Sequence, residues 1–205
     1  MQLEQELKEK TADIEKLLER MLPEEAGLQK TIFSAMRYSL MAGGKRIRPL
    51  LIAETYRFFG GTDMALAEPF MAAIEMIHTS SLVHDDLPCM DDDMMRRGKA
   101  STWAEYGEDM GVLAGDALMI YAFEVAAKAF NEVSEADDLK RVGRAIEILA
   151  AKTGIYGMIG GQCADICAEE LPADQGTKEL LWYIHKNKTA ALIEAALMIG
   201  AVLAG

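Results

Sequence analysis

Helical periodicity runs through almost the whole chain, and it constrains the fold more than any other feature. Apolar residues recur at intervals of three and four, alanine, leucine, methionine and glutamate dominate, and strand signals are nearly absent. We predict an all-α protein with helices at about 2–21, 28–42, 49–59, 64–86, 101–107, 111–130, 134–151, 153–169 and 177–205. Several of these helices are almost entirely apolar, so we expect them inside a helical bundle.

The rest of the composition limits the classes of protein and partner. The chain has no internal repeat or linker, so we expect a single domain over residues 1–205. A formal net charge of -12 argues against nucleic acid and anionic membranes as partners. The longest apolar run, 189–205, is short for a membrane span, so no stable membrane insertion is expected. Three cysteines without metal-finger spacing indicate a reducing, cytoplasmic setting, with Cys163 and Cys167 expected to be buried thiols.

An aspartate-rich segment at 84–93 is the strongest chemical signal. Five carboxylates lie within its last nine residues, and Arg96 and Arg97 follow closely. Crowded carboxylates repel each other unless cations compensate them, and Mg²⁺ prefers oxygen ligands and substrate phosphates. The paired arginines match a diphosphate by charge and geometry. A solvated acidic loop is the alternative, but the apolar residues interspersed here make it the poorer explanation.

The spacing of the aspartates leaves the metal ligands open. On an unbroken helix Asp85 and Asp91 would point roughly 240° apart, whereas Asp85 and Asp92 would share a face. Pro88 lacks a backbone donor and clashes with the carbonyl of His84, so the helix is expected to break after Asp86. Spacing alone therefore does not decide which aspartate lies opposite Asp85.

Three further stretches carry basic residues. Gly43-Gly44-Lys45-Arg46-Ile47-Arg48-Pro49 combines a flexible turn, three cations and a helix start, which favours an anion site over a basic surface turn. His78 lies two helical turns before Asp85 and is either a core residue or a phosphate contact. Lys188 interrupts an apolar helix, so it either reaches solvent along its stem or meets a buried anion. The Gly160-Gly161 pair could simply permit close helix packing.

Together these pieces resemble the trans-isoprenyl diphosphate synthases, the group of farnesyl and geranylgeranyl diphosphate synthases. The matching stretches run from about residue 28 to the end of the chain. They are GGKRIRP (43–49), EMIHTSSLVHDDLPCMDDDMMRRGKAS (75–101), LAGDAL (113–118), GGQCADI (160–166) and NKTAALI (187–193). The resemblance implies an all-α bundle around a deep central cavity, a homodimer, and Mg²⁺ as cofactor.

The resemblance also implies roles for individual residues. Isopentenyl diphosphate would bind Lys45, Arg48, His78 and Arg97. Mg²⁺ would bind Asp85 and Asp91, and the allylic diphosphate (dimethylallyl, geranyl or farnesyl) would bind Arg96, Lys188 and Thr189. The catalytic residues would then be Asp85, Asp91, Arg96 and Lys188, which act on the departing diphosphate.

Product length would depend on side chains about one turn before the aspartates. Family members that stop at farnesyl (C15) tend to carry a bulky aromatic five residues before the first aspartate. Ser80 holds that position here and Ser81 follows it, so geranylgeranyl (C20) is the favoured product, although Met76 and Met119 could also limit the tail.

One family feature, a second aspartate-rich motif on a later helix, is missing from the sequence. The domain is therefore expected to be incomplete at its C-terminal end and the chain, as given, inactive. A terpene cyclase of the same fold and a non-catalytic or regulatory subunit of a prenyl synthase are the alternatives.

Overall fold

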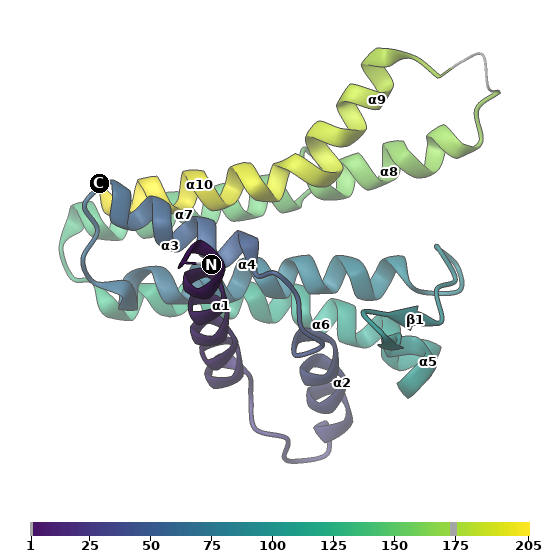
Figure 1. Cartoon of the computed structure of the whole chain (residues 1–205), viewed down its shortest axis with the longest axis horizontal. Helices are drawn as coiled ribbons and strands as arrows, with labels where there is room; N and C mark the ends of the chain where they lie inside the picture. The colour runs from purple at the N-terminus through teal and green to yellow at the C-terminus, as the bar shows by residue number, and fades with distance from the viewer. Residues whose placement is uncertain (1, 173–175) are drawn as a thin grey trace. The chain divides into compact units, whose positions relative to one another are not determined.

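The computed structural model describes residues 2–172 and 176–205, and the described chain is mostly helical with very little strand, which confirms the predicted all-α class (Figure 1). The helices are α1 (Gln2–Met21), α2 (Lys30–Leu40), α3 (Ile47–Phe58), α4 (Met64–Asp85), α5 (Thr102–Tyr106), α6 (Glu108–Ala127), α7 (Ala136–Thr153), α8 (Met158–Glu169), α9 (Lys178–Ile184) and α10 (Ala191–Ala204). A 3₁₀ turn (Lys128–Glu132) follows α6, and a π-helix (His185–Ala190) joins α9 to α10. The strands β1 (Met95–Arg96) and β2 (Lys99–Ala100) form a short antiparallel hairpin that the sequence analysis did not predict.

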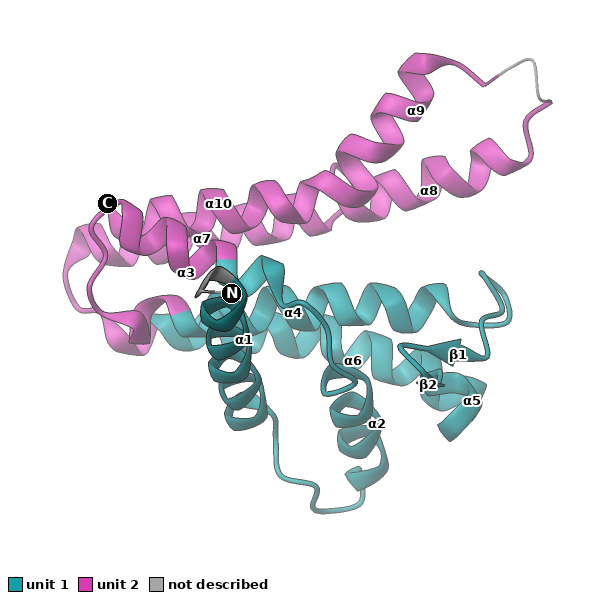
Figure 2. Cartoon of the chain, in the orientation of Figure 1, with its two compact units in different colours: residues 1–50, 68–129 teal, residues 51–67, 130–205 magenta. Residues whose placement is uncertain are grey.

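The chain forms two compact units (Figure 2). Unit 1 comprises residues 1–50 and 68–129, and unit 2 comprises residues 51–67 and 130–205. Helices α3 and α4 each contribute residues to both units. The expectation of a single domain over residues 1–205 stays a prediction.

Unit 1 is built around the contact between α4 and α6, which lie side by side (Figure 1). Glycines on α6 permit this approach, since a Cβ at Gly115 would lie 2.1 Å from His84 Nε2 and one at Gly111 would lie 3.0 Å from Leu87 Cδ2. The core of α4 includes Phe70 and Ile74, both with no exposed surface. Because α4 is apolar on nearly all sides, it needs to be covered on nearly all sides, and most of its residues are buried. It ends beside the hairpin.

Unit 2 contains α7 to α10 and part of α3. The packing is close at Gly200 of α10, where a Cβ would lie 2.6 Å from the Ile52 carbonyl oxygen. On α8 only Met158 and Gly161 are buried, so the expectation for the cysteines is wrong: Cys163 and Cys167 are both exposed free thiols. An i, i+4 pair shares a helix face, but here that face is turned to solvent.

Two helical stretches of the described chain, 108–132 and 178–204, are long and apolar enough to cross a membrane by length and composition alone. Core helices of soluble proteins meet the same criteria. The expectation of no membrane insertion stays a prediction.

Candidate functional site

The aspartate-rich segment folds back on the end of α4. Asp91 N donates to the Asp85 carbonyl oxygen at 2.8 Å, and Asp93 N donates to the Asp86 carbonyl oxygen at 3.1 Å. Asp92, between them, has a left-handed φ of 53°. The predicted break in the helix is therefore confirmed, and the turn brings the backbone of Asp91 against that of Asp85, although the two would diverge on a continuous helix.

The five carboxylates of this turn differ in exposure. Asp91, Asp92 and Asp93 are exposed, Asp85 is partly buried, and Asp86 is buried. In the part of the chain that the structure describes, no three or more side chains of His, Cys, Asp or Glu are grouped as they would be around a metal ion. The Mg²⁺ assignment to Asp85 and Asp91 therefore stays a prediction.

Arg96 is bound by Asp86, a residue to which the sequence analysis gave no role. Arg96 Nε donates to both carboxylate oxygens of Asp86, at 2.9 and 3.2 Å, and Nη2 donates to Asp86 as well. Nη2 also reaches Asp93 Oδ2 at 3.2 Å. Burial raises the pKa of the Asp86 carboxyl, and the hydrogen bonds from Arg96 oppose that rise.

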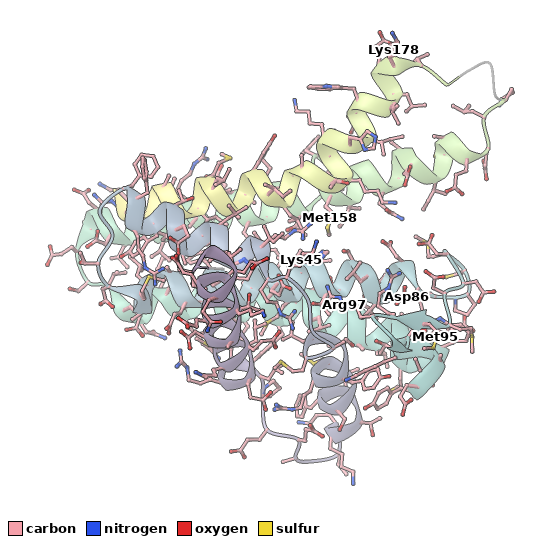
Figure 3. The ribbon with its side chains drawn as sticks, viewed as in Figure 1. Lys45, Asp86, Met95, Arg97, Met158 and Lys178 are labelled. Carbon is pink, nitrogen blue, oxygen red and sulfur yellow. The ribbon has the colours of Figure 1, made fainter. Side chains whose placement is uncertain are left out.

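A separate cationic pocket of about 520 Å³ lies beside the start of α3. Its lining includes Lys45, Arg48, His78 and Arg97, the four residues that the family resemblance assigned to isopentenyl diphosphate. Figure 3 labels Lys45 and Arg97, which come from different segments of unit 1. The structure thus brings the predicted residues together, while their ligand stays a prediction.

Two residues of the pocket have unusual electrostatics. Burial, with the nearby arginines (Arg48 first among them), lowers the pKa of His78 to about 3, so the imidazole is neutral at pH 7. The Nε of Arg48 is buried without a hydrogen-bond partner, and burial lowers the pKa of its guanidinium. A cation with an unsatisfied buried donor is suited to a multivalent anion such as a diphosphate.

Arg46 lies between Lys45 and Arg48 in the lining but faces inward. Its Nε donates to Glu15 Oε1 at 2.7 Å, Nη1 to Glu75 Oε1 at 2.8 Å, and Nη2 to the Leu40 carbonyl oxygen at 2.7 Å. Its side chain has no exposed surface, and its φ is 48°. Arg46 therefore anchors this turn. The sequence did not predict this role, because Lys45 and Arg48 beside it are also cations.

Arg97 links the hairpin to the glycine turn. Its Nη1 donates to the Gly43 carbonyl oxygen. Gly44 has a φ of 144°, and a Cβ there would lie 2.8 Å from Arg97 Nη1, so a side chain at this position would displace the guanidinium. The absence of a side chain at Gly44 thus leaves room for the Arg97 guanidinium in the pocket, which gives a physical reason for glycine at this position of the GGKR motif.

The predicted residues Lys188 and Thr189 belong to the π-helix of unit 2. Lys188 Nζ donates to Asp165 Oδ2 on α8, and both side chains are about one-third exposed. Lys188 is therefore paired within unit 2, a third outcome beside the two expected. A Cβ at Gly161 would lie 2.1 Å from Lys188 N, which confirms that this glycine permits close helix packing. Thr189 is exposed.

The predicted product-length residues lie on α4. Ser80 is fully buried, and its Oγ donates to the Ile77 carbonyl oxygen at 2.8 Å and lies 3.9 Å from Met119 Sδ on α6. Ser81 is partly buried and donates to the His78 carbonyl oxygen at 2.8 Å. Both hydroxyls are therefore satisfied by the helix itself. Their effect on product length stays a prediction.

Comparisons with known proteins agree on one family. A family model described as polyprenyl synthetase matches residues 29–205. Geranylgeranyl pyrophosphate synthase 11, chloroplastic, of Arabidopsis thaliana is 50% identical over 175 residues, which is 85% of this chain and 48% of that relative. The heterodimeric geranylgeranyl pyrophosphate synthase large subunit 1, chloroplastic, of the same plant is 48% identical over 174 residues, 85% of this chain and 46% of that relative.

A solved structure extends the likeness to the fold. The apo crystal structure of an FPP/GFPP synthase from Zymomonas mobilis superposes with a TM-score of 0.90 at 34% identity, covering 99% of this chain and 71% of that chain. The chain spans about half the length of the curated relatives it matches.

Proposed function

Because the chain belongs to the polyprenyl synthetase family, we propose that it acts as a short-chain trans-prenyl diphosphate synthase, which joins an allylic diphosphate to isopentenyl diphosphate. The observation that carries the proposal is the presence of two distinct charged clusters in unit 1. One is the aspartate-rich turn with Arg96, and the other is the cationic pocket with Lys45, Arg48, His78 and Arg97. Two substrates that both bear diphosphates need two such sites.

The aspartate-rich turn fits Mg²⁺ by the chemistry of its donors. Its exposed and partly exposed side chains offer carboxylate oxygens, and Asp85 and Asp91 are joined through their backbones. Mg²⁺ bound there would neutralise charge on the departing diphosphate. Arg96 would bind the same diphosphate.

The cationic pocket would hold isopentenyl diphosphate. Lys45, Arg48 and Arg97 supply positive charge, while Arg46 is neutralised by its carboxylate partners. The neutral imidazole of His78 can donate one hydrogen bond to a phosphate oxygen. Such fixed donors would orient the second substrate so that its double bond meets the allylic carbon.

The product, the assembly and the location are also proposals. Small serines at positions 80 and 81 favour geranylgeranyl (C20) over farnesyl (C15) diphosphate. A homodimer is proposed from the family resemblance, with a heterodimer as the alternative because one relative is named as a heterodimeric large subunit. Light scattering of the purified chain separates monomer from dimer. The free cysteines agree with a reducing compartment, for which we retain the cytoplasm.

The proposal is tested by binding and turnover together. Titration calorimetry with isopentenyl diphosphate and with geranyl diphosphate plus Mg²⁺ should detect both. Arg48→Ala should weaken isopentenyl diphosphate about 10-fold or more and leave geranyl diphosphate within about twofold, since only one pocket loses a charge-assisted donor. The matched control is Arg57→Ala, an exposed arginine of α3.

Turnover is then measured with radiolabelled isopentenyl diphosphate and chromatography of the products, using a version of the protein that carries the second aspartate-rich motif of the family. A C20 product that disappears with EDTA supports the proposal. Binding of geranyl diphosphate without isopentenyl diphosphate would favour a terpene cyclase. Binding of both without turnover, even at saturating Mg²⁺, would favour a non-catalytic subunit.

A further inference from the structure

The carboxylates of the aspartate-rich turn are not equivalent, and Asp86 stands apart from the others. Its side chain is 3% exposed, whereas that of Asp93 is 54% exposed. A divalent ion that keeps water and binds substrate phosphates needs ligands open to solvent. Asp86 is poorly placed for that task, while Asp91 is exposed.

The oxygens of Asp86 are already committed to Arg96. Three donor–acceptor pairs join the two side chains, through Nε and Nη2 of the guanidinium and both carboxylate oxygens. Bidentate pairs of this kind fix the plane of the guanidinium as well as its position. Among the hydrogen bonds of the described residues, Arg96 uses Nε and Nη2, which leaves Nη1 to meet a ligand.

The neighbouring arginine is fixed by a different partner. Arg97 reaches back to the Gly43 carbonyl oxygen and lines the cationic pocket. Of these two consecutive arginines, Arg97 lines the cationic pocket, whereas Arg96 is held at the aspartate-rich turn, mainly by the buried Asp86 and also by Asp93.

We propose that Asp86 is a positioning residue, which orients Arg96 toward the allylic diphosphate and is not itself a ligand of the metal. The choice of the allylic diphosphate as ligand rests on the proposed function. The pairing of Asp86 with Arg96, and its effect on the binding of any diphosphate, do not. The change Asp86→Asn keeps the size of the side chain while removing the charge and one acceptor.

The experiment is a double-mutant cycle in which binding to the whole chain is measured by calorimetry. The variants are Asp86→Asn, Arg96→Met and the double variant, and the probes are geranyl diphosphate and inorganic pyrophosphate, each with Mg²⁺. Each single variant should weaken binding about 10-fold, and the double variant should be within about twofold of Arg96→Met, because Asp86 acts through Arg96. Isopentenyl diphosphate should bind unchanged, which a general structural defect would not allow. Asp137→Asn, which removes an 82% exposed carboxylate, is the matched control.

Metal binding provides the second readout. Mn²⁺ titration followed by electron paramagnetic resonance should give the same affinity for Asp86→Asn as for the parent, while Asp85→Asn should weaken it. Equal loss in both variants would overturn the inference, as would independent effects of Asp86→Asn and Arg96→Met.

Two further outcomes separate the inference from the proposed function. If the parent chain binds pyrophosphate but not geranyl diphosphate, the proposed function fails. The double-mutant cycle with pyrophosphate then still tests whether Asp86 acts through Arg96. A chain that binds neither overturns both. If Asp86→Asn does not fold, Asp86→Glu retains the charge and should recover folding and pyrophosphate binding to within about threefold of the parent. A folded Asp86→Glu chain that binds pyrophosphate no better than Arg96→Met contradicts the inference.

Discussion

Replacing Arg46 with methionine should test how the cationic pocket is supported. The guanidinium has no exposed surface and joins α1, α2 and α4 through Glu15, the Leu40 carbonyl and Glu75. Methionine keeps an unbranched apolar stem of similar length but removes all three hydrogen bonds. Glu75, which is 2% exposed, then loses its ion-pair partner.

The expected loss of stability follows from that environment. Hydrogen bonds to charged groups contribute about 1.5–3 kcal/mol each, and breaking a buried ion pair on one side costs about 3–5 kcal/mol. Glu15 is more exposed and can be rehydrated, so most of the loss comes from Glu75. We expect about 4 kcal/mol, which corresponds to a fall of about 8–16 °C in Tm for a chain of this size.

Urea unfolding followed by far-UV circular dichroism measures the change. Arg57→Met is the matched control, because Arg57 pairs with Glu54 at 2.9 Å between side chains that are 50% and 43% exposed, and its loss should cost less than about 0.5 kcal/mol. Combining Arg46→Met with Glu75→Gln should recover a good part of the loss, because the uncompensated charge is removed. A loss below about 1 kcal/mol for Arg46→Met, or a double variant no more stable than the single, would refute the reasoning.

Three further predictions concern the same unit. The folded pKa of His78, about 3, lies below its unfolded value of about 6.5, so the stability from neutral His78 is complete above pH 6.5 and is lost as pH falls toward 3. Between pH 7 and pH 5 the free energy of unfolding should therefore fall less for His78→Gln than for the parent, as measured by denaturation at both pH values. An equal fall contradicts the shift. Gly44→Ala should displace Arg97 and weaken isopentenyl diphosphate at least about fivefold by calorimetry, whereas Gly143→Ala, on an open helix face, should leave binding unchanged and add up to about 1 kcal/mol of stability; equal binding by the two variants would exclude the steric role. Ser80→Tyr should shorten a C20 product to C15, as measured by chromatography, because the fully buried position 80 beside Met119 would carry a ring in place of a hydroxymethyl group. An unchanged product would mean that tail length is limited elsewhere.

The helices could be predicted because their periodicity is local. The range 2–21 agrees with α1 as observed, and α4 differs from its predicted range by one residue. The hairpin could not be predicted, because each strand has two residues and its turn depends on left-handed φ values at Arg97 and Gly98. The cysteines were misjudged because a helical pattern gives no indication of which face of α8 is covered.

The site was predicted by chemical type but not by orientation. Lys45, Arg48 and His78 do share a pocket. The inward partners, Arg46 and Asp86, have the same chemistry as the outward residues beside them. Only tertiary burial distinguishes a cation that binds a ligand from one that binds a carboxylate of its own fold.

The turn of the hairpin has a consequence for how this segment can vary. Arg97 and Gly98 both have positive φ, 51° and 81°, as a type I′ turn requires, and asparagine followed by glycine is the pair that such a turn prefers. An arginine held in this conformation costs about 1–2 kcal/mol. Asparagine at position 97 would therefore favour the turn, whereas arginine supplies the contact with the Gly43 carbonyl oxygen and a positive charge in the pocket lining. A stabilising substitution at this residue would remove both, so it should be avoided in engineered variants.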